Sequence, residues 1–167
     1  MVYLINMKKI VGVMGSGSKE ATETDLNLAY DIGKIIAELG VVLLCGGKTG
    51  VMNESAKGAK ENGVLTVALG PGLDKSELND YIDIPIMTGM HSGRNFPNIL
   101  SSDVLVFVSV GSPGTLTELA FAIQYEKPSV VINGTDKLRA YIDEISDNKV
   151  LFVNTIEEVQ TKLRELL

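Results

Sequence analysis

The 167-residue sequence contains a single cysteine, no tryptophan and only 5% aromatic residues. Because Cys45 has no second cysteine to pair with, no internal disulfide can form, which is typical of a reducing compartment and predicts a cytoplasmic protein. Cys45 ends an apolar run, which indicates packing rather than a nucleophile. The sequence also lacks a run of about 18 apolar residues, so we expect no transmembrane helix and no membrane partner.

Basic residues are outnumbered, since 15 Lys and Arg against 21 Asp and Glu give a formal net charge of −6. An acidic chain without tryptophan lacks both the basic surface and the stacking platform that nucleic-acid binding uses, so we expect no nucleic-acid partner. Net charge does not exclude small anions, which bind through backbone N–H groups at helix N-termini. The candidate ligands are therefore small molecules.

Metal chemistry has little support in the sequence. His91 is the only histidine and offers no second partner for a metal site or a catalytic triad, so we expect no metal.

The length predicts one domain over residues 1–167, since domains average roughly 150 residues. Residues 1–7 are too short and lack the cationic flank of a signal peptide, and we interpret them as a leader with Met7 as an alternative start.

Short apolar runs alternate with helical patterns along the chain. Continuous apolar runs of four to seven residues are typical of strands that are covered on both faces. The expected strands are 10–14, 41–45, 64–69, 84–87, 104–110, 129–132 and 151–153. The expected helices are 24–39, 51–62, 95–102, 115–125, 138–144 and 156–166. Pro85 indicates that its strand lies near an edge of the sheet.

The alternation of strands and helices with short loops predicts βαβ units and a parallel sheet. We therefore predict an α/β fold, a doubly wound Rossmann-like parallel sheet in a three-layer α/β/α sandwich. In such folds ligands bind beyond the carboxyl ends of the strands. The unusual loops of this chain are expected at that edge.

Three glycine-rich segments, 15–17, 46–50 and 111–115, each follow a strand and precede a helix. Glycine lets a ligand approach the backbone, and the helix that follows offers unpaired N–H groups and a partial positive charge. A tight turn is the better explanation for any one segment, but three at one edge favour a phosphate site. The candidate ligand-binding residues are Gly15, Ser16, Gly46, Gly47, Gly50, Arg94, Asn95, Gly111, Ser112, Gly114 and Thr115.

The sequence contains parts of two familiar nucleotide-binding motifs but completes neither. The segment Gly47-Lys48-Thr49 resembles the end of a P-loop, but the required first glycine is replaced by Val42 inside a strand. The segment Gly15-Ser-Gly17 begins like a dinucleotide fingerprint, but Glu20 stands where Gly or Ala is needed. We therefore expect neither a Walker-type nucleotide site nor NAD or FAD.

Two charged residues accompany the glycine segments. Glu118 follows Thr115 by three positions, the spacing of a capping box, and the same spacing recurs at Thr155 and Glu158, so spacing alone makes Glu118 a helix cap. Arg94 lies in a glycine-rich loop before a helix. There its guanidinium either clamps a phosphate or carboxylate bidentately or is a solvated surface charge.

The segments Gly46–Met52, Gly89–Asn95 and Gly111–Glu118 together resemble the Rossmann-like superfamily of LOG (lonely guy) proteins, which includes proteins once described as lysine decarboxylases and the molybdenum-cofactor carrier proteins. The resemblance extends over residues 10–132. It implies a homodimer or a larger closed assembly with helices of both subunits near the site. Spare apolar positions for such an interface are Phe96, Ile99, Leu116, Leu119 and Phe121.

LOG enzymes release a free base and ribose 5-phosphate from cytokinin nucleoside 5′-monophosphates, and their signature is Pro-Gly-Gly-x-Gly-Thr-x-x-Glu with an upstream Arg-Lys pair. In this sequence Val110 replaces the proline, Ser112 replaces the second glycine and Asn95 replaces the lysine. The arginine and the glutamate are kept as Arg94 and Glu118. The Gly-Met-x-x-x-Arg-Asn segment is more similar to the carrier branch.

The glycine segments, Arg94 and the resemblance lead to two functional hypotheses with a small ligand, beside a third in which the protein is an oligomeric scaffold without one. The first is a carrier that binds a phosphate-bearing nucleotide or a pterin ligand of the molybdopterin type, with no required cofactor. The alternative is a phosphoribohydrolase that cleaves the N-glycosidic bond of nucleoside 5′-monophosphates. There Glu118 would stabilise the oxocarbenium-like sugar and position water, and Arg94 would orient the substrate. Whether the protein is an enzyme stays open at this point.

Overall fold

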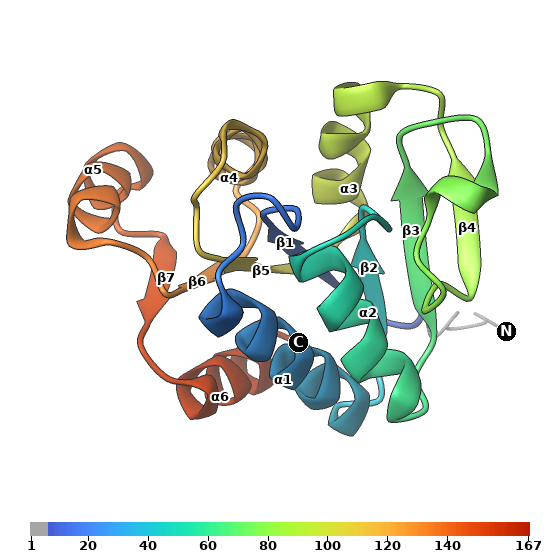
Figure 1. Cartoon of the computed structure of the whole chain (residues 1–167). Coiled ribbons are helices and arrows are strands. Elements are labelled where there is room, and N and C mark those ends of the chain that lie inside the picture. Colours follow the sequence, from blue (N-terminus) through green and yellow to red (C-terminus); the bar gives the residue numbers. More distant parts are fainter. Residues whose placement is uncertain (1–6) are drawn as a thin grey trace, which may run out of the picture.

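The computed structural model describes residues 7–167. Apart from Met7, the expected leader lies outside the described residues, as does the choice between two start residues. The described chain forms one parallel sheet of seven strands in the order β4-β3-β2-β1-β5-β6-β7 (Figure 1). The strands are β1 (Ile10–Gly15), β2 (Val42–Cys45), β3 (Thr66–Gly70), β4 (Ile84–Met87), β5 (Val104–Val108), β6 (Ser129–Ile132) and β7 (Val150–Val153).

Helices cover both faces of the sheet. They are α1 (Glu23–Glu38), α2 (Val51–Glu61), α3 (Asn95–Ser101), α4 (Pro113–Gln124), α5 (Asp136–Ser146) and α6 (Ile156–Leu166), with the 3₁₀ turns η1 (Lys75–Glu77) and η2 (His91–Arg94). Helices α1, α2 and α6 pack on one face and α3, α4 and α5 on the other (Figure 1). The predicted doubly wound, Rossmann-like three-layer fold is confirmed.

The central strand β5 shows why the apolar runs are continuous. Val104, Val106 and Val108 belong to the core beneath α1, α2 and α6, whereas Leu105 and Phe107 belong to the core beneath α3, α4 and α5. All five side chains are fully buried. Because successive side chains of a strand point to opposite faces, a strand between two helical layers needs an apolar residue at every position.

Several element boundaries differ from the predicted ones. The strand expected over 104–110 ends at Val108, because Ser109 adopts a left-handed conformation with φ 48°. The helix expected over 115–125 begins two residues earlier, at Pro113. As Pro85 predicted, β4 is an edge strand of the sheet.

Helices α1 and α2 pack in unusually close contact. A side chain at Gly33 would overlap the backbone oxygen of Ser55, and one at Gly58 would overlap the backbone oxygen of Tyr30. Two glycines therefore let the two helix backbones approach each other, one from each side. The face of α2 that meets α1 consists of small residues, since Ser55, Ala56 and Ala59 are fully buried. This contact fixes the position of α2 and of its N-terminus.

The strand order reverses between β1 and β5. From β1 the chain proceeds outward through β2, β3 and β4, then returns through α3 to β5 on the other side of β1. The loops after β1 and β5 therefore diverge to opposite faces and leave a crevice between them. Ligands of doubly wound proteins bind at such a switch point.

Between residues 7 and 167 no helix is long and apolar enough to cross a membrane. The expected cytoplasmic location and the expected lack of a nucleic-acid partner stay predictions.

Candidate functional site

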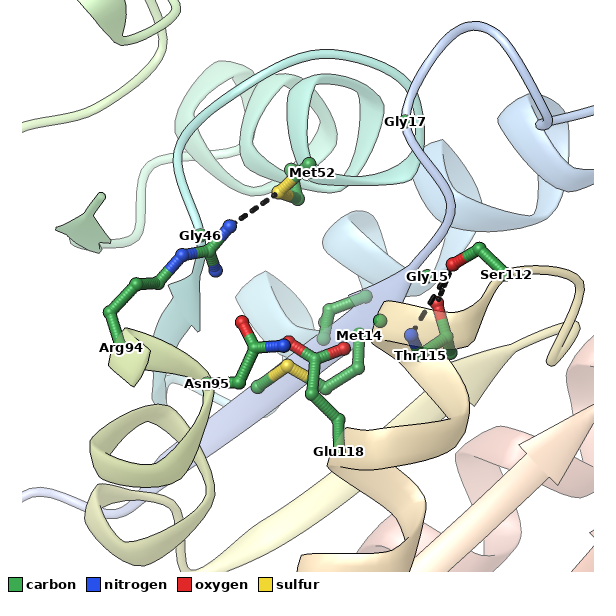
Figure 2. A pocket seen from close by; sticks show the side chains of 12 residues that line it. Met14, Gly15, Gly17, Gly46, Met52, Arg94, Asn95, Ser112, Thr115 and Glu118 are labelled. Atoms are coloured by element: carbon green, nitrogen blue, oxygen red, sulfur yellow. Dashed lines mark hydrogen bonds between the residues drawn. The ribbon is translucent and has the colours of Figure 1, made fainter. Parts of the chain in front are cut away.

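A pocket of about 160 Å³ lies beyond the carboxyl ends of β1 and β2, at the switch point. Four segments far apart in the sequence contribute its walls: the end of β1, the turn before α2, the start of α3 and the first two turns of α4 (Figure 2). The lining residues are Val13, Met14, Gly15, Gly17, Gly46, Met52, Arg94, Asn95, Ser112, Gly114, Thr115 and Glu118.

Helix α4 presents its N-terminus to the pocket. Ser112 is the N-cap, and its Oγ accepts a hydrogen bond from the Thr115 N–H at 3.3 Å, while Pro113 occupies the first helical turn. Among the described residues the N–H of Gly114 has no hydrogen-bond partner, and Gly114 lines the pocket. A backbone donor at the positive end of a helix is therefore available to a ligand.

The predicted capping box at Thr115 and Glu118 is wrong. Because Ser112 takes the N-cap position, Glu118 lies in the second turn of α4, too far along the helix to reach the cap backbone. The matching prediction at Thr155 and Glu158 is confirmed, since both hydrogen bonds of that box are present at the start of α6. Glu118 therefore has no capping role, and its side chain points into the pocket (Figure 2).

Helix α2 begins beside the pocket at Val51, and its N-cap residue Gly50 has φ 68°. The backbone of Gly17 and Ser18 occupies the space that a side chain at Gly50 would need. The N–H of Val51 donates to the backbone oxygen of Ser16 at 3.1 Å. These contacts lock the loop after β1 onto the start of α2.

We predicted that each of the three glycine segments leads directly into a helix. The loop after β1 does not. Helix α1 starts only at Glu23, and its N-terminus is closed by a capping box in which Thr22 and Asp25 satisfy each other's backbone N–H groups. Of the three helices that follow the glycine segments, α2 and α4 therefore begin beside the pocket.

Arg94 extends from the end of η2 across the pocket wall toward α2 (Figure 2). Its guanidinium lies against the Cα of Gly46, where any side chain would overlap it. Its one hydrogen bond within the described chain is a long contact of 3.9 Å with the Met52 thioether, and its buried Nε has no partner. Burial lowers the pKa of Arg94 and Glu118 opposes this shift, but a guanidinium stays charged at any physiological pH.

Glu118 is a buried carboxyl group at the same pocket, with 6% of its surface exposed. Burial raises the pKa of Glu118 to about 7, and the positive charge of Arg94 offsets part of that rise. Within residues 7–167 the Glu118 carboxyl group forms neither a salt bridge nor a hydrogen bond. Asn95, which is also buried, points toward it (Figure 2). The pocket thus holds one cationic and one titratable group whose hydrogen-bonding capacity is largely unused.

The pocket brings together eight of the predicted site residues: Gly15, Gly46, Arg94, Asn95, Ser112, Gly114, Thr115 and Glu118. Four others, Ser16, Gly47, Gly50 and Gly111, do not line it. Gly47 has φ 73° and its backbone oxygen accepts hydrogen bonds from Asn79, so it shapes the turn. The buried hydroxyl of Ser16 has no partner among the described residues and lies near Gly111.

Two methionines of the pocket wall, Met14 and Met52, were not singled out from the sequence. Both occupy helix or strand positions that read as ordinary core, and only the fold shows that they end at a ligand-sized space. A polar cluster at the start of α1 was also missed. Asp25 accepts hydrogen bonds from Ser109 Oγ at 2.6 Å and Asn133 Nδ2 at 2.9 Å, so it ties the loops after β5 and β6 to α1.

Cys45 and His91, which the sequence analysis also considered, do not line the pocket. Cys45 is fully buried, and burial raises the pKa of its thiol to about 11, in line with a packing role. His91 lies on η2 with an exposed side chain and does not line the pocket. In the part of the chain that the structure describes, no group of three His, Cys, Asp or Glu side chains is placed to hold a metal ion.

Fold and pocket together define a Rossmann-like α/β protein with a small polar pocket at the switch point of its sheet. A model of the SLOG cluster4 family matches residues 8–160, and the chain belongs to this family. A protein of Archaeoglobus fulgidus, described as uncharacterized, is 45% identical over 130 residues, which cover 74% of this chain and 83% of that protein.

Two solved structures are similar over nearly the whole chain. The molybdenum cofactor binding protein of Rippkaea orientalis has a TM-score of 0.91 and 38% identity, covering 96% of this chain and 98% of that one. The molybdenum cofactor carrier protein of Chlamydomonas reinhardtii has a TM-score of 0.89 and 39% identity, covering 95% and 98%. The predicted resemblance to the molybdenum-cofactor carrier branch is confirmed.

Proposed function

We propose that this protein binds a phosphate-bearing pterin of the molybdenum-cofactor type at the switch-point pocket and carries it without chemical change. The two similar structures are named for binding or carrying that cofactor and match more than nine-tenths of the chain. The proposal rests on the position and the unused hydrogen-bonding capacity of the Arg94 guanidinium. Its guanidinium is held beside Gly46 with a buried Nε that lacks a partner, which suits a bidentate contact with an anion.

The donors around Arg94 fit a phosphate group. The guanidinium, the free N–H of Gly114 and the hydroxyl groups of Ser112 and Thr115 all belong to residues that line the pocket. Phosphate prefers this mixture of a cationic fork and backbone donors at a helix N-terminus. Asn95 adds an amide, which can donate or accept.

The size of the pocket indicates how much of the ligand it holds. Its volume of about 160 Å³ is below the roughly 300–1,000 Å³ of pockets that enclose a whole drug-sized ligand. We therefore place the phosphate end in the pocket and the larger ring system over its opening. Affinity for phosphate alone should consequently be much weaker than affinity for the complete cofactor.

The test uses molybdenum cofactor freshly released from a molybdoenzyme. After incubation and gel filtration under anaerobic conditions, we expect molybdenum to co-elute with the parent protein and to be strongly reduced with Arg94→Ala. Lys48→Ala is the control, because Lys48 lies in an exposed neighbouring turn and does not line the pocket. Equal retention by the parent and Arg94→Ala would refute the assignment of the anion to Arg94.

One observation favours the phosphoribohydrolase as a second candidate. Glu118 is a buried carboxyl group whose pKa lies at about 7, so near neutral pH it is available in both protonation states, as general acid–base catalysis requires. Incubation with adenosine 5′-monophosphate distinguishes the candidates. Release of adenine that is abolished in Glu118→Gln supports the hydrolase, whereas binding without release supports the carrier.

We also propose that the protein assembles through the outer surface of α3 and α4. Of the apolar residues expected to be spare, Ile99 and Leu119 are used by the core, but Leu116 is 45% exposed. Leu100 on α3 and Tyr125 at the end of α4 are 40% and 46% exposed. Sedimentation at micromolar concentration should give a mass of at least two chains, and the mass of one chain would contradict the proposal.

A further inference from the structure

Arg94 and Glu118 carry opposite charges in one pocket, yet they do not form a salt bridge with each other. In most proteins two such buried groups would pair directly, because a buried charge without a partner is costly. Figure 2 shows the Glu118 carboxyl group between Arg94 on one side and the Ser112–Thr115 turn on the other. Any ligand atom that reaches both sets of donors therefore lies next to this carboxyl group.

The hydrogen-bonding chemistry of the three groups restricts that ligand. Arg94 and the N–H of Gly114 are donors only, so they attract the oxygen atoms of an anion. An ionised carboxylate is an acceptor only. A fully deprotonated oxyanion would thus place its own acceptor oxygens against those of Glu118, which leaves two buried acceptors unpaired and is unfavourable. One proton between them removes the conflict.

We propose that Glu118 is a specificity-determining residue, which makes the pocket select an oxyanion bound together with one proton, such as hydrogen phosphate or the singly protonated form of a phosphate monoester, over an oxyanion without a proton, such as sulfate. The inference rests on the proposed function, because it assumes that the anion is bound at Arg94. The proton lies between a Glu118 oxygen and an anion oxygen. It comes with the ligand when the ligand carries one, and from solvent when it does not.

The surroundings of Glu118 identify which groups set its protonation. Helix α4 packs against α3, β1 and β5, and none of these three elements carries an ionisable side chain. The charged group that acts on Glu118 is Arg94 at the end of η2. The thiol of Cys45 on β2 also faces the pair, but with a pKa of about 11 it stays neutral below pH 9. A pH effect between 6 and 8 on the binding of sulfate, which itself stays a dianion over this range, is therefore assigned to Glu118.

Hydrogen phosphate and sulfate form a matched pair of probes, since at pH 8 both are dianions of similar size and only hydrogen phosphate carries a proton. We measure binding of each to the parent protein by calorimetry at constant ionic strength. At pH 8, where Glu118 is mostly ionised, hydrogen phosphate should bind about tenfold more tightly than sulfate. Between pH 8 and pH 6 sulfate should gain about tenfold in affinity as Glu118 takes up its proton.

The variant Glu118→Gln completes the test. Its amide can donate to either anion, so sulfate should bind to it with an affinity that is independent of pH and close to that for hydrogen phosphate. Equal binding of both anions to the parent, with no pH effect on sulfate, would overturn the role of Glu118 and leave the anion site in place. No binding of either anion to the parent would overturn the anion site itself, and with it the proposed function.

Discussion

The substitution Glu118→Gln should make the protein more stable above neutral pH. Burial raises the pKa of Glu118 from an ordinary 4.5 to about 7, so folding favours the protonated carboxyl group. A difference of one pKa unit corresponds to about 1.4 kcal/mol. Once Glu118 is ionised, the folded state is therefore destabilised by about 3 kcal/mol. The stabilising effect of protonation is complete below the unfolded-state pKa and lost as pH rises to about 7.

The assay is urea denaturation of the parent and Glu118→Gln at pH 5 and pH 8. The difference in free energy of unfolding should change in favour of the variant by about 2–3 kcal/mol between these pH values. At pH 8 this equals a rise in Tm of about 4–12 °C. Glu158→Gln in the capping box of α6 is the control and should show no such pH-dependent gain. A difference for Glu118→Gln that does not vary with pH would refute the burial of an unpaired carboxylate.

Three further predictions concern the surroundings of the pocket. Gly46→Ala should displace the guanidinium of Arg94 and weaken phosphate binding at least tenfold by calorimetry, whereas Gly111→Ala, whose nearest neighbour is 3.6 Å away, should not. Ser112→Ala should lower the free energy of unfolding by about 1 kcal/mol through loss of the N-cap. Burial opposes ionisation of Asp25, but its hydrogen bonds prevail and lower its pKa; we therefore expect Asp25→Ala to lower the free energy of unfolding, measured by urea denaturation, by about 3 kcal/mol at pH 7 and by less at pH 3. The ionised Asp25 stabilises the fold above pH 3.8, and this stabilisation is lost as pH falls.

Most of the fold could be predicted because the information is local. Apolar runs gave the strands. The helices predicted over 24–39 and 51–62 are each followed directly by a glycine, Gly40 and Gly63, and both glycines have positive φ. The edge position of β4 followed from a single proline. These features depend on residues adjacent in the sequence, and the parallel arrangement then follows from the alternation of strands and helices.

The two capping predictions show where local information becomes ambiguous. Thr115 with Glu118 and Thr155 with Glu158 have identical spacing, yet only the second pair forms a box. Ser112 followed by Pro113 is itself a helix start, and proline at the first helical position is preorganised for it. Two overlapping start signals compete, and the earlier one removes Glu118 from the first turn.

The contact between Gly46 and Arg94 could not be predicted from sequence. The two residues are far apart in the chain and meet because α3 returns across the sheet from β4 to β5. Whether the Glu118 carboxyl group has a partner likewise depends on how α4, η2 and α3 are placed relative to one another. Sequence therefore predicted eight of the twelve residues that line the pocket, while the chemistry of their arrangement required the fold.

The interlocked glycines of α1 and α2 have a consequence for how the pocket changes shape. Backbone contacts at Gly33 and Gly58 leave no room for sliding, so these two helices should move as one rigid body. The opposite wall is built differently, from a 3₁₀ turn and the seven-residue helix α3, held to α4 by edge-on stacking of Phe96 on Phe121 and Tyr125. We therefore expect a large ligand to enter by an outward swing of the α3 wall, with Arg94 travelling on the moving part.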